Sequence, residues 1–192
     1  MTRLPPHPAS PPRIVEWPER SYAFIAHRLP LADVGPAVAD GFARVEDWLR
    51  RRGLAPAGVP FLRYRRIDMA GTLDIETGIP VEGAGVAEAP IGFDRLPAGR
   101  YAGLLWSGPY DSLVAGNAEL IAWGGRERIA WDMTPSPEGD RFGARLEPFL
   151  VGPAQEPDPA NWLTEIAIRI AEDETGHSDE RLLPVPPSEH SA

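Results

Sequence analysis

Two glutamates lie at matching places in the sequence, and a buried carboxylate is a group that can hold or transform a ligand. Glu76 opens the segment ETGIPV (76–81), and Glu165 opens EIAIRI (165–170). Side chains of a strand alternate between its faces, so the isoleucines share one face and the glutamates point to the other. A carboxylate in an apolar cleft forms an ion pair, anchors a cation, or acts as a catalytic acid or base. All three roles stay open for Glu165, and the hairpin at Glu76 leaves room for a position near solvent.

Aromatic residues are plentiful near the face to which the glutamates point. The chain holds six tryptophans, four tyrosines and six phenylalanines. Ring faces attract cations, so a carboxylate among rings suits a lipophilic cation. Ordinary core packing is the alternative for each ring, and Phe42, Trp48 and Trp123 lie in helical patterns that favour it. The rings expected to line a ligand pocket are Tyr64, Tyr101, Trp106, Tyr110, Trp131, Phe149 and Trp162.

The elements that must position these residues occur twice in the same order. Each copy reads as a strand, a helix that starts at a Gly-Pro pair and stops at glycine, and two further strands. The strands are expected at 22–28, 60–67 and 72–81, and again at 100–106, 142–150 and 162–170. Two such units can bury one continuous core. We therefore predict an α+β fold, a tandem pseudo-symmetric pair of β-α-β-β units around a central ligand groove.

The predicted boundaries follow from the same repeat. Repeat one spans 14–82 and repeat two spans 91–170. A proline-rich lead at 1–13 is expected to be disordered, and 171–192 is expected to form an acidic, proline-rich tail. The lead offers no room for a helix-turn-helix, so we expect a ligand-binding domain without a DNA-binding half.

Composition excludes several classes of function. The net charge of −9 disfavours direct binding to nucleic acid. The chain has no cysteine and only four scattered histidines, so we expect neither a metal nor another cofactor. No apolar run is long enough for a membrane span, and the start lacks a secretory signal, which predicts a cytoplasmic protein. Arginine supplies all 19 basic residues, which indicates GC-rich coding and a bacterial source.

Two longer segments resemble a known family. LPAGRYAGLLWSGPYDSL (96–113) and LEPFLVGPAQEPDPANWLTEIAIRI (146–170) are similar to the GyrI-like small-molecule-binding superfamily, the effector-binding domain of AraC-type and MerR-type regulators. The resemblance implies two SHS2-like modules whose groove binds lipophilic, often cationic, compounds of the multidrug type. It also implies an acidic residue on the last strand, which maps to Glu165, and groove aromatics that map to Tyr64, Tyr101 and Tyr110.

The chain departs from the family pattern at two places. Trp106 and Ser107 stand where the family often has histidine, and the strand that usually ends Glu-x-Tyr reads Glu147-Pro148-Phe149. The resemblance leaves three functions open. One is binding of a hydrophobic or cationic small molecule with Glu165 as the charge anchor. Another is hydrolysis of strained, cyclopropane-bearing compounds with Glu165 as the catalytic acid or base. The third is a gyrase-inhibitor-like module that binds a protein partner.

Overall fold

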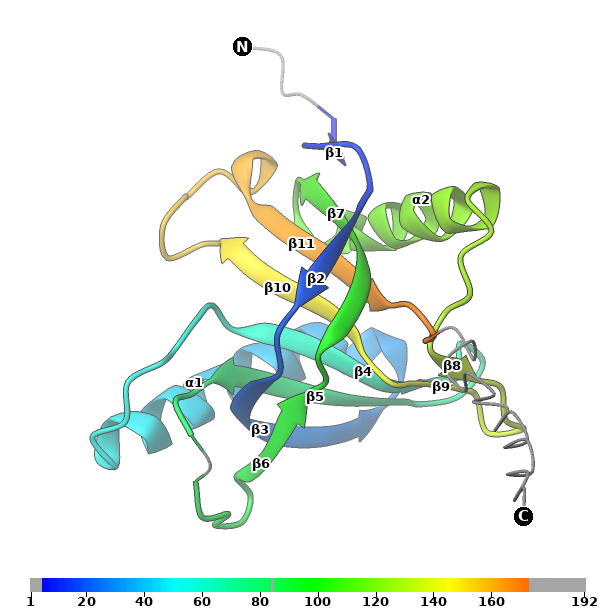
Figure 1. Ribbon diagram of the computed structural model, residues 1–192. Coiled ribbons are helices and arrows are strands. Elements are labelled where there is room, and N and C mark those ends of the chain that lie inside the picture. The colour runs from blue at the N-terminus through cyan, green and yellow to red at the C-terminus, as the bar shows by residue number, and fades with distance from the viewer. Residues whose placement is uncertain (1–4, 84, 173–192) are drawn as a thin grey trace, which may run out of the picture.

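Two copies of a β-α-β-β unit make up most of the computed structural model, which describes residues 5–83 and 85–172 (Figure 1). The first copy consists of β3 (Arg20–Leu29), α1 (Val34–Arg51), β4 (Phe61–Ile67) and β5 (Leu73–Pro80). The second consists of β7 (Gly99–Ser107), α2 (Leu113–Arg126), β10 (Arg145–Val151) and β11 (Leu163–Arg169). The order of elements that the sequence predicts is therefore confirmed. None of the described helices is both long and apolar enough to cross a membrane.

Shorter elements join and extend these two units. The additional strands are β1 (His7–Pro8), β2 (Arg13–Trp17), β6 (Gly92–Leu96), β8 (Met133–Thr134) and β9 (Asp140–Phe142). The 3-10 turns are η1 (Leu31–Asp33), η2 (Tyr110–Ser112) and η3 (Pro159–Asn161).

The lead differs from its sequence prediction. His7 and Pro8 pair with Trp106 and Ser107 of β7, and β2 continues along the same strand from Arg13. A free strand edge offers backbone hydrogen bonds to any extended segment. The lead can therefore be ordered by pairing with β7 even though its side-chain composition is typical of a disordered segment. Residues 1–4 and the predicted tail beyond residue 172 lie outside the described residues.

The paired strands form one antiparallel sheet in the order β1-β7-β11-β10-β4-β5-β3-β6, with β2 also on β7. The last strand of each unit lies in the middle of that unit: β5 lies between β3 and β4, and β11 lies between β7 and β10. The two units meet where β10 pairs with β4. This arrangement relates the units by a pseudo-two-fold axis through the β10–β4 junction.

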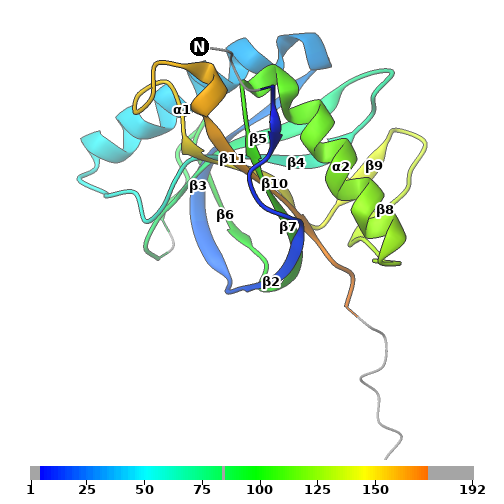
Figure 2. The ribbon, with the colours of Figure 1, turned by 90° about the horizontal axis from the view of Figure 1, so that it is seen from above.

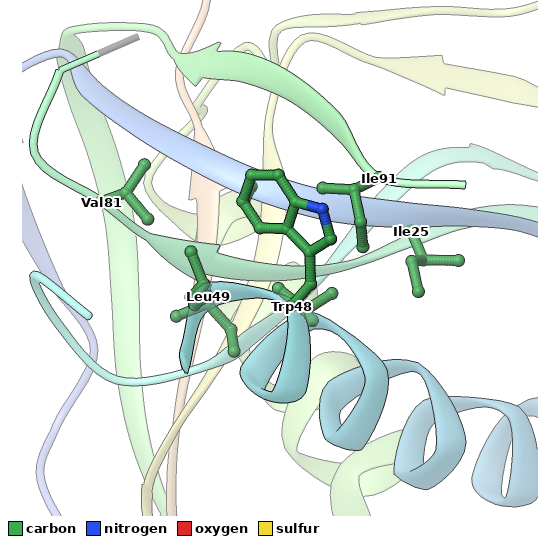
Figure 3. Close-up of a cluster of buried hydrophobic side chains, with 8 residues drawn as sticks. Ile25, Trp48, Leu49, Val81 and Ile91 are labelled. Carbon is green, nitrogen blue, oxygen red and sulfur yellow. The ribbon is translucent and has the colours of Figure 1, made fainter. Parts of the chain in front are cut away.

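The sheet has two different faces. Both helices cover one side of it, and its two ends curl away from the helices toward each other (Figure 2). We call these sides the helix-covered face and the concave face. On the helix-covered face, Trp48 and Leu49 of α1 pack with Ile25, Val81 and Ile91 (Figure 3), and α2 packs on a second cluster that includes Leu104 and Ile166. The concave face holds a third cluster built around Tyr22, Phe61, Tyr101 and Leu146.

Candidate ligand-binding site

The two glutamates singled out in the sequence occupy equivalent strand positions. Glu76 pairs with Ala26 of β3, and Glu165 pairs with Leu105 of β7. Tyr22 and Tyr101 are equivalent as well. Tyr22 pairs with Pro80, four residues after Glu76 on β5, and Tyr101 pairs with Arg169, four residues after Glu165 on β11. Side-chain alternation places all of these glutamates and tyrosines on the concave face.

Glu76 is fully engaged in a buried polar cluster. The Tyr22 hydroxyl donates to Glu76 Oε2 at 2.6 Å, and Arg63 donates to that same hydroxyl and to Asp94. Only 6% of Glu76 is exposed. Burial raises its pKa, while the Tyr22 hydrogen bond and the charge of Arg63 act against this. The cluster links β3, β4, β5 and β6, so we assign it a structural role and call it a clamp.

Glu165 lacks the partners that hold Glu76. Tyr101 donates instead to the carbonyl oxygen of Pro97 at 2.7 Å, and the register of β10 with β11 places Pro148 where repeat one has Arg63. Within the described part of the chain, Glu165 has no hydrogen-bond or ion-pair partner. Burial raises its pKa, and the charges of Arg13 and Arg20 oppose the rise. Glu165 is thus a half-buried carboxylate with no hydrogen-bond or ion-pair partner in residues 5–83 and 85–172.

Three of the predicted pocket aromatics gather with Phe42, which was assigned to the core, and they do so on the helix-covered face. The Phe149 and Tyr110 rings lie 4.9 Å apart, and the Tyr110 and Trp162 rings lie 4.5 Å apart. Phe42 of α1 joins at 5.7 Å from Phe149. All four rings are half-buried. We call Phe42, Tyr110, Phe149 and Trp162 the aromatic seam, which connects α1 with the start of α2. Tyr64 packs against the same hydrophobic cluster as Phe149.

A carboxylate that the sequence analysis did not choose lies beside this seam. Glu147 is 3% exposed and is two residues from Phe149 on the same face of β10. It accepts hydrogen bonds from the Tyr64 hydroxyl at 3.0 Å and from Asn117 Nδ2 at 2.8 Å. Arg145 reaches it through Asn117, whose Oδ1 accepts from Arg145 Nη2 at 2.7 Å. Burial raises the pKa of Glu147, and these two hydrogen bonds act against the rise.

The signal for Glu147 was present in the sequence. Alternation along RLEPFLV puts Glu147 and Phe149 on one face and Leu146 and Pro148 on the other. Against the family pattern the segment stands out only as a departure from Glu-x-Tyr, and the pattern gives the glutamate itself no role. Asn117 carries no comparable signal, because a polar residue on a helix is more often solvated than buried.

The remaining predicted residues lie apart from both carboxylates. Tyr101 is fully buried on the concave face and stacks on Trp17 at 4.6 Å. Burial raises its pKa to about 12. Trp106 lies under α2 and donates to Ser112 Oγ at 2.9 Å, and Trp131 packs against Gly124 of the same helix. The structure therefore separates Glu165 from six of the seven predicted rings by the thickness of the sheet.

Two surface depressions lie away from Glu147 and Glu165. Two shallow depressions have volumes of about 360 and 330 Å³; the first includes Glu76 and Arg65, and the second includes Trp123 and Ile129. Neither includes Glu147 or Glu165. Because only 3% of Glu147 is exposed, a ligand that contacts it has to displace neighbouring side chains.

Solved structures share this fold at low sequence identity. The EcmrR regulator in complex with DNA is 20% identical with a TM-score of 0.68, and the match covers 85% of this chain and 58% of that chain. The EcmrR C-terminal domain alone is 20% identical with a TM-score of 0.64, at 85% and 98% coverage. This chain thus spans little more than half of the full regulator.

Two further structures add information about relatives. SAV2435 bound to tetraphenylphosphonium is 12% identical with a TM-score of 0.55, and the match covers 88% of this chain and 98% of that chain. A hydrolase from Listeria innocua is 13% identical with a TM-score of 0.55, at 86% and 94% coverage. At these identities the likeness shows the fold.

The sequence itself shows the family. No curated protein sequence matches the chain. The profile of the GyrI-like small molecule binding domain matches residues 10–171, which include both repeats and both carboxylates. The resemblance inferred from the two motif segments is confirmed, and the chain belongs to the GyrI-like small-molecule-binding family.

Proposed function

We propose that this domain binds a lipophilic organic cation in the aromatic seam, with Glu147 as the buried negative group. One observation carries the proposal: Glu147 is a buried carboxylate whose direct hydrogen-bond partners, Tyr64 and Asn117, are both neutral. Arg145 donates to Asn117 and lies beyond ion-pair distance of Glu147, although its charge acts on Glu147 from there. A charge buried without a contacting counter-ion is costly, and a bound cation supplies the missing partner.

The seam supplies the second half of such a site. Its four rings are half-buried, so each keeps an accessible face or edge. A cation over an aromatic face gains about 0.5–2 kcal/mol per contact, depending on how far it is desolvated. Phe149 connects Phe42 of α1 with Tyr110 at the start of α2, so a ligand inserted there touches both repeats. The tetraphenylphosphonium bound to SAV2435 is a cation of this chemistry.

A more specific role is suggested by the architecture of EcmrR. EcmrR carries its C-terminal domain in a chain that binds DNA. We propose that this domain does the ligand-binding part of such a multidrug sensor, taking up hydrophobic or cationic compounds.

Glu165 remains the competing anchor. It has no partner among the described residues, but it faces Arg13 and Arg20, whose charges oppose a cation. Because Glu147 and Glu165 lie on opposite faces of the sheet, one pair of variants separates the two sites.

The test is titration with tetraphenylphosphonium, followed by tryptophan fluorescence and calorimetry. We expect Glu147→Gln to weaken binding at least tenfold, since removing one partner of a desolvated charge pair costs about 2–5 kcal/mol. Glu165→Gln is the matched control and should bind like the wild type. The opposite pattern would move the site to the concave face. Saturable binding that neither variant changes would contradict both carboxylate anchors. Circular dichroism checks that each variant is folded.

A second function is favoured by the state of Glu165. A half-buried carboxylate with a raised pKa and no partner is suited to exchange a proton with a substrate. We propose hydrolysis of a strained, cyclopropane-bearing compound as the reaction that this group would assist. Mass spectrometry after incubation tests it: a hydrated product that Glu165→Gln abolishes supports catalysis, and recovery of unchanged compound leaves binding alone.

A further inference from the structure

The solvent-facing surfaces of the two helices differ sharply. α1 exposes charged residues, among them Asp40, Arg44 and Glu46. α2 instead exposes apolar residues: Val114 is 65% exposed and Ile121 is 42% exposed. Surface helices of globular domains carry polar residues on this side. An apolar outer face on one helix of a highly charged protein indicates a surface that is covered by something else.

Six exposed residues on and next to α2 follow a regular spacing. We call Asp111, Val114, Ala118, Ile121, Gly125 and Arg128 the outer row; Asp111 lies in η2, Arg128 lies two residues past the end of α2, and the other four lie on α2. Their numbers rise by three, four, three, four and three. The four members on α2 thus have the spacing by which one helix packs along another helix, and the two charged members flank them. The row is apolar in its middle and ends in a carboxylate at one end and a guanidinium at the other.

We infer that the outer row is the interface of an antiparallel, two-fold symmetric dimer of this chain. With the axis midway between Ala118 and Ile121, Val114 meets Gly125 of the second copy, and Ala118 meets its Ile121. Each large side chain thus faces a small one, as close packing between helices requires.

The charges at the ends of the row agree with the same register. Asp111 meets Arg128 of the second copy, and the symmetry repeats the pair at the other end. Neither residue has an ion-pair partner elsewhere in the described chain, whereas the flanking Glu119 and Arg126 pair with each other at 3.7 Å. A parallel pairing would set Asp111 against Asp111 and Arg128 against Arg128, which is repulsive.

Gly125 supports this register independently. Gly116 and Gly124 are required within the chain, because a Cβ at either position would collide with Ile166 or with Trp131. A Cβ on Gly125 would meet nothing within 4 Å. Glycine in a helix costs about 0.5–1 kcal/mol relative to alanine. The dimer explains its presence, because Gly125 makes room for Val114 of the second copy.

The interface should be weak. One face of a 14-residue helix falls below the area of about 1,200 Å² that stable complexes bury. We expect a dissociation constant in the micromolar range, on the order of −8 kcal/mol.

Sedimentation velocity of the full chain over roughly 1–200 µM tests the dimer, since this range spans a micromolar constant. We expect the mass to rise from 20.9 kDa toward twice that value. Ile121→Glu should hold the protein at the monomer mass, and Ala43→Glu, at an exposed alanine on α1, should dimerise like the wild type. A wild type that stays monomeric throughout, or an Ile121→Glu variant that still dimerises, would overturn the inference.

Cysteine cross-linking tests the register, because the natural chain has no cysteine. Val114 and Gly125 lie about 16 Å apart along the helix, at 1.5 Å per residue. If the pair is antiparallel, cross-links should form when the Val114→Cys and Gly125→Cys variants are mixed. Each variant on its own should remain largely uncross-linked. Cross-links that form mainly within each single variant would indicate a parallel pair and overturn the register.

Discussion

Repeat one and repeat two share a backbone plan but use their carboxylates differently. In repeat one, Glu76 is held by Tyr22, with Arg63 close behind, and is nearly inaccessible. At the equivalent place in repeat two, the tyrosine donates to a backbone carbonyl and Pro148 replaces the arginine. Glu165 therefore has no partner in the part of the chain that the structure describes. The comparison teaches that a duplicated position can be a clamp in one copy and a free charge in the other.

The helix-covered face shows a second difference between the repeats. Leu62 pairs with Thr77, and the register places Glu147 at the matching position opposite Ile166. Leucine there is ordinary core, whereas Glu147 needs Tyr64 from repeat one and Asn117 from α2 to satisfy it. Both differences place in repeat two a carboxylate that lacks a contacting counter-ion among the described residues. The two carboxylates that we propose as ligand-binding groups therefore both lie in repeat two, whereas Glu76 of repeat one is held within a structural cluster.

The largest expected effect comes from making repeat two resemble repeat one. Glu147→Leu leaves the Tyr64 hydroxyl without its acceptor, removes one of the two acceptors of Asn117 Nδ2, and takes away the negative charge near the buried Arg145. We expect a loss of about 3–5 kcal/mol in the free energy of unfolding, as for other broken buried charge networks. Urea unfolding followed by tryptophan fluorescence measures it. The double variant Glu147→Leu/Arg145→Leu should recover part of the loss; a single variant as stable as the wild type would show that the network is unimportant.

A smaller effect separates the two equivalent tyrosines. Tyr22→Phe removes a hydroxyl that donates to Glu76 and accepts from Arg63, so we expect a cost of about 2–3 kcal/mol, the range for hydrogen bonds to charged groups. Tyr101→Phe removes one hydrogen bond to the Pro97 carbonyl and should cost about 1 kcal/mol. Equal losses in urea unfolding would remove the distinction between clamp and free charge.

The smallest effect is the pH dependence contributed by Glu165. Its pKa is raised by burial, so the folded state holds the proton more tightly than the unfolded state. Stability from this group is therefore full below the ordinary glutamate pKa and falls as the pH rises through the raised value. Across that interval the free energy of unfolding of Glu165→Gln should rise relative to that of the wild type, by less than about 1 kcal/mol because the group is only half-buried. Unfolding curves between about pH 4 and pH 8 measure it; curves that stay parallel would contradict a raised pKa.

Sequence patterns were enough to predict the duplicated elements. The period-two and helical spacings depend on neighbours in the chain, and the structure places strands and helices where those spacings indicated. The short strands β1, β2, β6, β8 and β9 were not expected. Strands β1, β2, β6 and β9 are held by strands distant in sequence, and β8 is a two-residue strand that pairs only with β9, so their own residues carry little signal.

The sequence by itself determined the family, the two β-α-β-β units, and the face of its strand to which each glutamate points. These follow from local alternation and from motifs within one segment. Only the tertiary structure decided which groups meet. It set Tyr64 and Asn117 around Glu147, gathered four rings on the helix-covered face, and left Glu165 alone on the other. The physical reason is that partners come from strands and helices far apart in the chain, and the pairing of β10 with β4, which brings them together, has no signature in either strand alone.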